Sequence, residues 1–139
     1  GQPPPFASLK VKPVSFHSDQ PLRTARLDGA HVALMHAPGE LVFEIPPAAR
    51  RLRARFGIAP FAYAEAAKTE GIAFTVEHAG ATTFQRTLDP ANEPSDRGIQ
   101  DLAVELPEGL KGTLTVRATN SGNRVNAADW VFWADVDFD

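Results

Sequence analysis

The chain contains no cysteine, and only one methionine and one tyrosine, in 139 residues. Without cysteine it can form no disulfide, no thiolate nucleophile and no zinc–thiolate site. Because oxidising and reducing compartments both tolerate such a chain, the absence of cysteine does not place the protein in the cell.

Long apolar runs and an excess of basic residues are missing as well. No stretch approaches the roughly 18 apolar residues of a membrane-spanning helix, so we expect no membrane span in this chain. The formal net charge is −3, whereas nucleic-acid binders carry a basic surface. We therefore expect no nucleic-acid partner.

Sequence motifs for catalysis are not found. There is no Gly-x-Ser-x-Gly nucleophile elbow, and the loop around Gly122 lacks the lysine of a phosphate-binding loop. The four histidines do not have the i,i+4 spacing of zinc proteases; they are His17, His31, His36 and His78. We therefore expect no enzyme activity.

What the chain does contain is a series of short alternating segments bounded by turn residues. In the clearest one, Leu52, Ala54 and Phe56 alternate with arginines, so that apolar and basic side chains sort onto opposite faces of a strand. Asp28-Gly29 and residues 79–82 are typical of hairpin turns. About nine strands are predicted, over residues 9–17, 31–36, 40–45, 51–56, 72–78, 83–88, 99–106, 112–119 and 129–138.

This pattern predicts an all-β fold with two antiparallel sheets packed as a sandwich. Pro13 restricts the first strand to a sheet edge or a bulge, and residues 63–68 favour one helical turn. The start of the chain, a glycine followed closely by three prolines, is typical of an expression scar and a linker. We expect residues 1–8 to be a Pro-rich linker and residues 9–139 to form a single β-sandwich domain.

Both tryptophans lie in the last predicted strand. Unbroken alternation places Trp130 and Trp133 on opposite faces. Trp130 shares its face with Phe132, Val136 and Phe138, so we interpret that face as core. Trp133 lies among carboxylates and is either an exposed platform for a ligand or a half-covered packing residue.

Several short motifs follow one another in a recognisable order. They are Gly29-Ala30-His31, His36-Ala37-Pro38-Gly39, Arg53-Ala54-Arg55-Phe56-Gly57, residues 71–77, residues 110–119 and the closing Ala128-Asp129-Trp130. Their order resembles that of NPCBM-like modules, which are jelly-roll sandwiches of the galactose-binding-domain type found beside bacterial glycoside hydrolases. The resemblance covers roughly residues 29–138 and implies a jelly-roll sandwich.

Residues 88–100 are also similar to sandwich domains at the C-termini of bacterial surface proteins and membrane glycosyltransferase-like proteins. Together the two resemblances imply an extracytoplasmic carbohydrate-binding accessory module within a larger bacterial protein. The chain has no clear match to the sugar-contacting residues of characterised members, so carbohydrate binding is implied at the level of the fold.

The loop before the last strand is the strongest candidate for a binding site. Sugars are bound by amide, guanidinium and carboxylate groups together with an aromatic face, and this region carries all of these. We expect the ligand-binding residues to be Tyr63, Asn120, Asn123, Arg124, Asn126, Asp129 and Trp133. The alternative is a polar loop that merely turns at Gly122.

Two other polar segments allow two interpretations each. The loop over residues 89–98 has oxygen ligands for a structural Ca²⁺, or its aspartates cap turns while Arg97 pairs with a carboxylate. Arg51, Arg53 and Arg55 either bind an anionic glycan or pair with acids on a neighbouring strand. Apart from that Ca²⁺ we expect no cofactor.

The sequence therefore predicts a non-catalytic carbohydrate-binding module of a bacterial surface or membrane protein. Its expected partners are a glycan and the other domains of the parent protein, and its expected location is the periplasm or the cell surface. The alternative is a structural or protein-interaction ectodomain without a small ligand, which would pack through the arginine-rich face or the Trp133 face.

Overall fold

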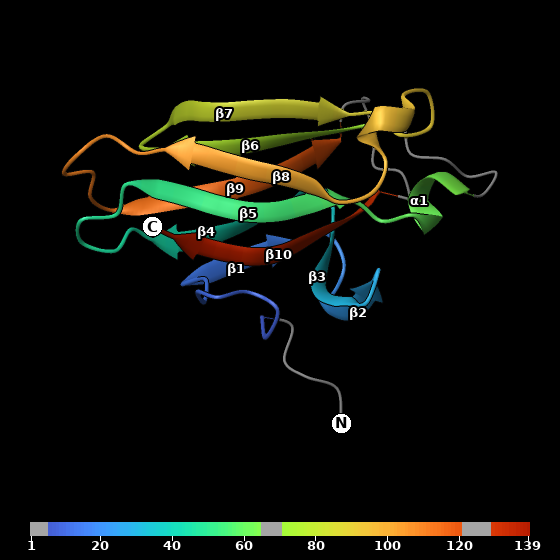
Figure 1. Cartoon of the computed structure of the whole chain (residues 1–139), viewed down its shortest axis with the longest axis horizontal. Coiled ribbons are helices and arrows are strands. Elements are labelled where there is room, and N and C mark those ends of the chain that lie inside the picture. The colour runs from blue at the N-terminus through green and yellow to red at the C-terminus, as the bar shows by residue number, and fades with distance from the viewer. Residues whose placement is uncertain (1–5, 65–70, 121–128) are drawn as a thin grey trace.

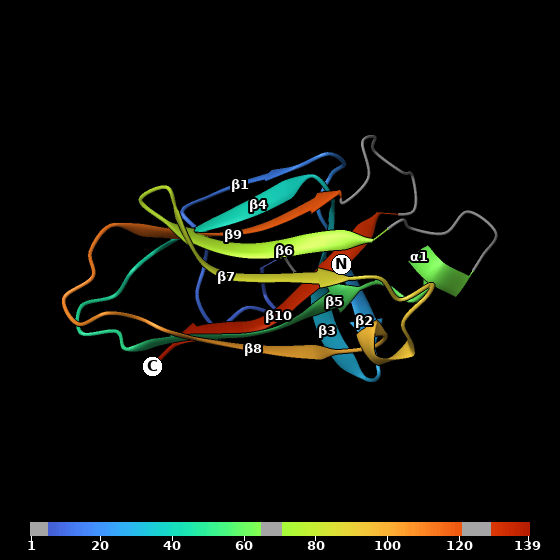
Figure 2. The ribbon, with the colours of Figure 1, turned by 90° about the horizontal axis from the view of Figure 1, so that it is seen from above.

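Two five-stranded antiparallel sheets pack face to face in the computed structural model, which describes residues 6–64, 71–120 and 129–139. Figure 1 shows the long strands running side by side, and Figure 2 separates the two layers. The predicted all-β sandwich of two antiparallel sheets is confirmed.

The two sheets each combine strands from distant parts of the chain. The first sheet has the order β1 (Ser15–Ser18), β4 (Gly39–Glu44), β9 (Thr113–Asn120), β6 (Ile72–His78) and β7 (Ala81–Leu88). The second has the order β2 (Arg23–Leu27), β3 (Ala30–His36), β10 (Trp130–Phe138), β5 (Arg51–Ile58) and β8 (Gln100–Glu105). The short helix α1 (Phe61–Ala64) follows β5, and a 3₁₀ turn (Pro94–Asp96) precedes β8. No helix in the described ranges is both long and apolar enough to cross a membrane.

Most neighbouring strands are not consecutive in the chain, so the chain crosses repeatedly between the sheets, as a jelly roll does. The exceptions are the hairpins β2–β3 and β6–β7. Asp28 and Gly29 have φ of 51° and 82°, and Ala79 and Gly80 have φ of 50° and 82°. Two successive positive φ values define the hairpin turn whose twist matches that of the strands. Both predicted hairpins are confirmed.

The alternation predicted for residues 51–56 is present in β5, where Leu52 and Phe56 are fully buried while the arginines face outward. The first predicted strand is shorter than expected, because β1 begins only after Pro13. It pairs with β4 alone, at the edge of its sheet, as a nearby proline requires. The strand β2 is not predicted from the sequence, because it is a half-exposed edge strand with a weak apolar pattern.

Three aromatic rings fill the centre of the space between the sheets. Trp133 stacks on Phe56 with ring centroids 5.8 Å apart, and it meets Phe74 nearly edge-on at 5.7 Å. Phe56 and Phe74 lie 4.8 Å apart. Offset and edge-on contacts of this kind add to the free energy gained by burying the rings.

The predicted faces of the last strand are wrong for both tryptophans. Trp133 is 0% exposed, whereas Trp130 is partly exposed on the other face. The cause is a β-bulge: Asp135 has φ of 51°, and the register between β10 and β5 shifts between Ala134 and Asp137. An extra residue reverses the alternation beyond it, so Val136 joins Trp133 in the core, not Trp130.

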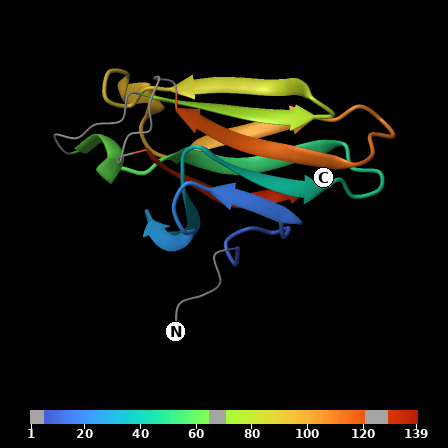
Figure 3. The same cartoon turned by 180° about the vertical axis from the view of Figure 1, so that it is seen from behind.

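The N-terminal segment binds this bulge. The backbone N–H of Asp135 donates to the carbonyl of Ser8 at 3.0 Å, and those of Lys10 and Val11 both donate to the carbonyl of Val136 at 3.1 Å. Leu9 is buried in the core between the sheets. Figure 3, which shows the molecule from behind, places this segment below β1.

The outer face of β10 carries a second, smaller apolar cluster. Phe132 packs there with Val32, Leu34 and neighbouring alanines. A Cβ on Gly57 of the adjacent strand would lie 2.7 Å from the Phe132 ring and 2.7 Å from the carbonyl of Gly98. Glycine is therefore required at Gly57 for this close approach.

The two tryptophans should contribute unequally to stability. Trp133→Ala should lower the free energy of unfolding by about 3–5 kcal/mol, because it empties the centre of the core. Trp130→Ala should cost clearly less, because part of that ring already faces water. Urea denaturation of both variants measures the difference, and equal losses would contradict the assignment of faces.

Candidate functional site

Polar and aromatic side chains gather at one end of the sandwich. Cross-strand pairing brings the strand termini together there, because Trp130 pairs with His36, Ile72 with Asn120, and Phe56 with Gln100. We call this the loop end, where β3, β5, β7 and β9 end and β4, β6, β8 and β10 begin. The helix α1 lies at the same end (Figure 1).

All the buried polar side chains in the described part of the chain lie at the loop end: His36, Gln100 and Asp129. Buried polar groups need hydrogen-bond partners, and the side chains of Gln100 and Asp129 have them. The amide of Gln100 donates to the carbonyls of Ser95 and Arg97 at 3.3 and 3.2 Å. The carboxylate of Asp129 accepts a hydrogen bond from the amide of Asn120. These bonds fix the backbone at the loop end.

His36 is the buried polar side chain that contacts Trp130. Its backbone N–H donates to the hydroxyl of Ser18 at 3.0 Å, and its Nδ1 lies 3.4 Å from a carboxylate oxygen of Asp19. The imidazole meets the Trp130 ring edge-on, with centroids 5.0 Å apart and planes at 88°. The indole of Trp130 is therefore held in one orientation although part of it is exposed.

A small cavity opens beside Trp130. It is lined by Arg23, Leu34, Phe61 and Trp130 and has a volume of about 180 Å³. Phe61, the first residue of α1, is 50% exposed. The guanidinium carbon of Arg23 lies 5.3 Å from the centroid of the Trp130 ring.

The residues around the cavity are held by backbone hydrogen bonds. The N–H of Ala59 donates to the carbonyl of Trp130 at 2.9 Å, and the N–H of Ala62 donates to the carbonyl of Ala59 at 2.9 Å. Leu34 is nearly buried and closes the cavity from below. Aromatic walls, an apolar floor and one cation suit a ligand with an apolar face and oxygen atoms along its rim.

The structure brings together only part of the predicted site. Asn120 and Asp129 are hydrogen-bonded to each other at the loop end. Tyr63 belongs to α1, but its side chain lies outside the part that the structure describes. Asn123, Arg124 and Asn126 also lie outside the described residues. Trp133 is fully buried, so its ring offers no exposed aromatic face.

Trp130, Arg23, Phe61 and His36 were missed as candidates. Trp130 was assigned to the core because the bulge at Asp135 was not foreseen. Arg23 lies on the unpredicted strand β2, and its nearness to Trp130 depends on the pairing of β2 with β3 and of β3 with β10. A single exposed aromatic such as Phe61 carries no signal in the sequence.

The arginines on β5 pair with acids. This agrees with the interpretation that they form ion pairs with a neighbouring strand. Arg51 Nε lies 2.7 Å from Glu105, Arg53 Nε lies 2.6 Å from Asp139, and Arg55 lies 3.8 Å from Asp101. These acids belong to β8 and to the end of the chain beyond β10, on either side of β5. The arginine-rich face is therefore electrically balanced.

The loop over residues 89–98 also uses its polar groups internally. The carboxylate of Asp96 accepts a hydrogen bond from the N–H of Asp89 at 2.9 Å and lies 3.6 Å from Arg86. Arg97 Nε donates to the carbonyl of Pro90 at 2.6 Å. In the described ranges no three histidine, aspartate or glutamate side chains come close enough together to hold a metal ion.

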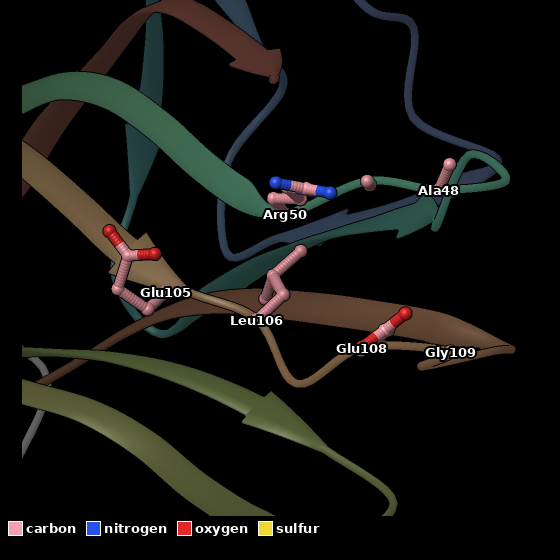
Figure 4. Close-up of a pocket in the computed structure, with 7 residues that line it drawn as sticks. Ala48, Arg50, Glu105, Leu106, Glu108 and Gly109 are labelled. Atoms are coloured by element: carbon pink, nitrogen blue, oxygen red, sulfur yellow. The ribbon is translucent and has the colours of Figure 1, made fainter.

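A larger cavity, of about 560 Å³, lies at the opposite end of the sandwich. Figure 4 shows it between two connections: Arg50 precedes β5, whereas Glu105, Leu106 and Glu108 belong to the end of β8 and the segment after it. Its lining contains one cation and two acids, and no aromatic residue. It lacks the stacking surface that the cavity beside Trp130 provides.

No protein-family model and no curated protein matches the chain. Solved structures do match. A CBM51 module from Clostridium perfringens GH95, in complex with methyl-galactose, is 13% identical with a TM-score of 0.68, covering 94% of this chain and 96% of that one. The CBM51-2 and INT domains of C. perfringens ZmpB, with CBM51-2 in complex with GlcNAc, are 16% identical with a TM-score of 0.68, covering 92% and 30%.

Tandem CBM51 modules of Sp3GH98 from Streptococcus pneumoniae are 16% identical with a TM-score of 0.57, covering 87% of this chain and 36% of theirs. The chain thus spans about a third of the length of the ZmpB and Sp3GH98 chains. At these identities the likeness shows the fold: a β-sandwich like those of carbohydrate-binding modules. Membership of the NPCBM-like modules and similarity to glycosyltransferase-like surface proteins stay predictions.

Asp129 should support the loop end structurally. Asp129→Ala removes the acceptor for the Asn120 amide and leaves buried polar groups without a partner, so it should cost about 1–3 kcal/mol of unfolding free energy. Asp101→Ala is the control, because that side chain is 88% exposed in a surface ion pair and should cost at most about 1 kcal/mol. Urea denaturation compares them, and a loss no greater for Asp129→Ala would contradict this role.

Proposed function

We propose that this domain is a non-catalytic glycan-binding module, extracytoplasmic and part of a larger bacterial surface protein. The observation that carries the proposal is the cavity at the loop end, where Trp130 and Phe61 present aromatic surface beside the guanidinium of Arg23. The module would hold its parent protein close to a polysaccharide or glycoprotein.

The physical chemistry of sugars supports this assignment. One side of a pyranose ring is rich in C–H groups and packs on aromatic rings, while the hydroxyl groups around its rim need hydrogen-bond partners. The cavity of about 180 Å³ is open and small, which suits a single sugar residue of a longer chain. We expect dissociation constants between µM and mM, or about −8 to −4 kcal/mol.

The structural neighbours support the same function. One CBM51 module is seen with methyl-galactose and another with GlcNAc. Another matched C. perfringens structure contains an M60 catalytic domain beside two CBM51 domains. In this domain the cavity lies at the loop end of the sandwich. A module that works beside other domains of one protein can present this end to a glycan.

The two tryptophans allow a direct test by NMR. An ¹⁵N-labelled sample gives one indole N–H signal for each tryptophan, and only Trp130 lies at the cavity. Titration with galactose, GlcNAc and oligosaccharides should shift the Trp130 signal saturably and leave the buried Trp133 signal in place. Saturable binding that leaves Trp130 unmoved would place the site elsewhere.

Two variants and a matched control complete this test. Trp130→Ala and Phe61→Ala should each weaken binding by about tenfold or more, because stacking on an aromatic ring is lost. Phe16→Ala should bind as the wild type does, since that ring is similarly exposed, at 54%, but lies on β1 outside the cavity. Full binding by both cavity variants would refute the proposed site.

A protein-interaction ectodomain is the second candidate, and one apolar surface favours it. Val14 is 58% exposed, and Phe16 nearby contacts Phe6 edge-on at 5.1 Å. Val14 also lines an apolar cavity with Ile45 and other residues of the end opposite the loop end. Of the two surfaces first expected for this role, the Trp133 face is not available, because Trp133 is buried. No response to any sugar at either indole signal would favour this second function.

A further inference from the structure

We propose that the glycan carries a carboxylate, as a uronic acid does, and that Arg23 binds it at the cavity beside Trp130. This inference rests on the proposed function and adds the class of sugar.

Arg23 differs from five of the nine arginines in the described ranges, which have a carboxylate partner. Five arginines form ion pairs with carboxylates within 4.0 Å: Arg51, Arg53, Arg55, Arg86 and Arg117. Across the described ranges no carboxylate lies within that distance of Arg23. Its contact is instead with the ring of Trp130.

The charge of the cavity linings separates the Arg23 site from two other cavities that contain arginine. The cavity at Arg50 also contains Glu105 and Glu108. The cavity at Arg53 and Arg55 also contains Asp101 and Asp135. The cavity beside Trp130 contains Arg23 and no acidic residue. A ligand that brings its own negative charge therefore completes this cavity, whereas the other two already contain both signs.

Two acids of the loop end lie beside other groups: Asp129 accepts a hydrogen bond from Asn120, and Asp19 lies beside His36. Asp19 lies between β1 and β2, and its carboxylate is 3.4 Å from Nδ1 of His36. Asp19 does not line the cavity. This carboxylate thus lies beside the imidazole that contacts Trp130 and is not among the carboxylates within 4.0 Å of an arginine in the described ranges.

The placement of Arg23 leaves its donors usable. Arg23 is the first residue of β2 and pairs with Leu34, the residue that forms the floor of the cavity. The guanidinium is held near Trp130 by a cation–π contact, which uses the charge of the group but none of its five N–H donors. Those donors can bind the two oxygens of a carboxylate side by side.

A carboxylate suits this site because it matches the single guanidinium. It carries one negative charge on two coplanar oxygens, the geometry that the arginine fork pairs with. In a uronic acid the carboxylate replaces the C6 hydroxymethyl group at the rim of the ring. Stacking of the ring against Phe61 or Trp130 then leaves that rim free to meet Arg23.

The experiment compares sugars that differ at C6 alone. The Trp130 indole signal is followed during titration with galactose, galacturonate and galactose 6-sulfate, and with glucose and glucuronate, at one pH and ionic strength. We expect the uronate of at least one series to bind about tenfold more tightly than its neutral partner, as a charge-assisted hydrogen bond at a partly exposed site allows. The preference should shrink in 1 M salt.

Arg23→Gln should abolish the preference for the uronate, so that the uronate binds no more tightly than its neutral partner. Arg26→Gln is the control. It removes an exposed arginine from the same strand, and residues three apart on a strand point to opposite faces. This variant should keep the full preference.

Three outcomes would overturn the inference. Equal affinity for uronate and neutral sugar in both series would leave the glycan-binding function intact and refute the carboxylate. Tighter binding of galactose 6-sulfate than of galacturonate would refute it in favour of a sulfated sugar. Saturable binding of none of the five sugars at the Trp130 signal would count against the proposed function itself, and the inference would fall with it.

Discussion

The β-bulge at Asp135 is the constraint on which the rest of the structure depends. By reversing the alternation of β10, it allows Trp133 and Val136 to face the core together while Trp130 and Phe132 face the other way. The rings of Phe56 and Phe74 pack on Trp133 and so fix the distance between the sheets. One irregular residue thus gives the last strand a core face that holds Trp133 and Val136, while Trp130 on the opposite face lines the cavity.

The bulge has its own support from a distant part of the chain. A bulge leaves backbone groups of its strand without ladder partners, and residues 8–11 take them up, since Ser8 accepts from Asp135 while Lys10 and Val11 donate to Val136. Leu9 then enters the core beside them. Polar side chains at the loop end support the other end of β10. Asn120, Asp129 and His36 hold the start of this strand, where Trp130 lies.

Features that depend on neighbours in the chain could be predicted from the sequence. The alternation of β5, the two hairpins and the closeness of Asn120 to Asp129 are all local or joined by one loop. The faces of β10 could not be predicted, because the positive φ of Asp135 goes with a hydrogen bond to Ser8, near the other end of the chain. The position of Arg23 beside Trp130 could not be predicted either, because it depends on the pairing of β2 with β3 and of β3 with β10.

The distribution of charge separates the paired arginines of β5 from Arg23. On β5 each arginine faces an acid on an adjacent strand or at the chain end, so the surface is neutral at close range and offers a free glycan little gain in electrostatic energy. Arg23 lies on an edge strand, where only β3 flanks it and the facing residue is Leu34. An edge position beside an aromatic ring therefore leaves this charge without a carboxylate partner in the described ranges, and this is the difference from the salt-bridged face on which the proposed carboxylate site depends.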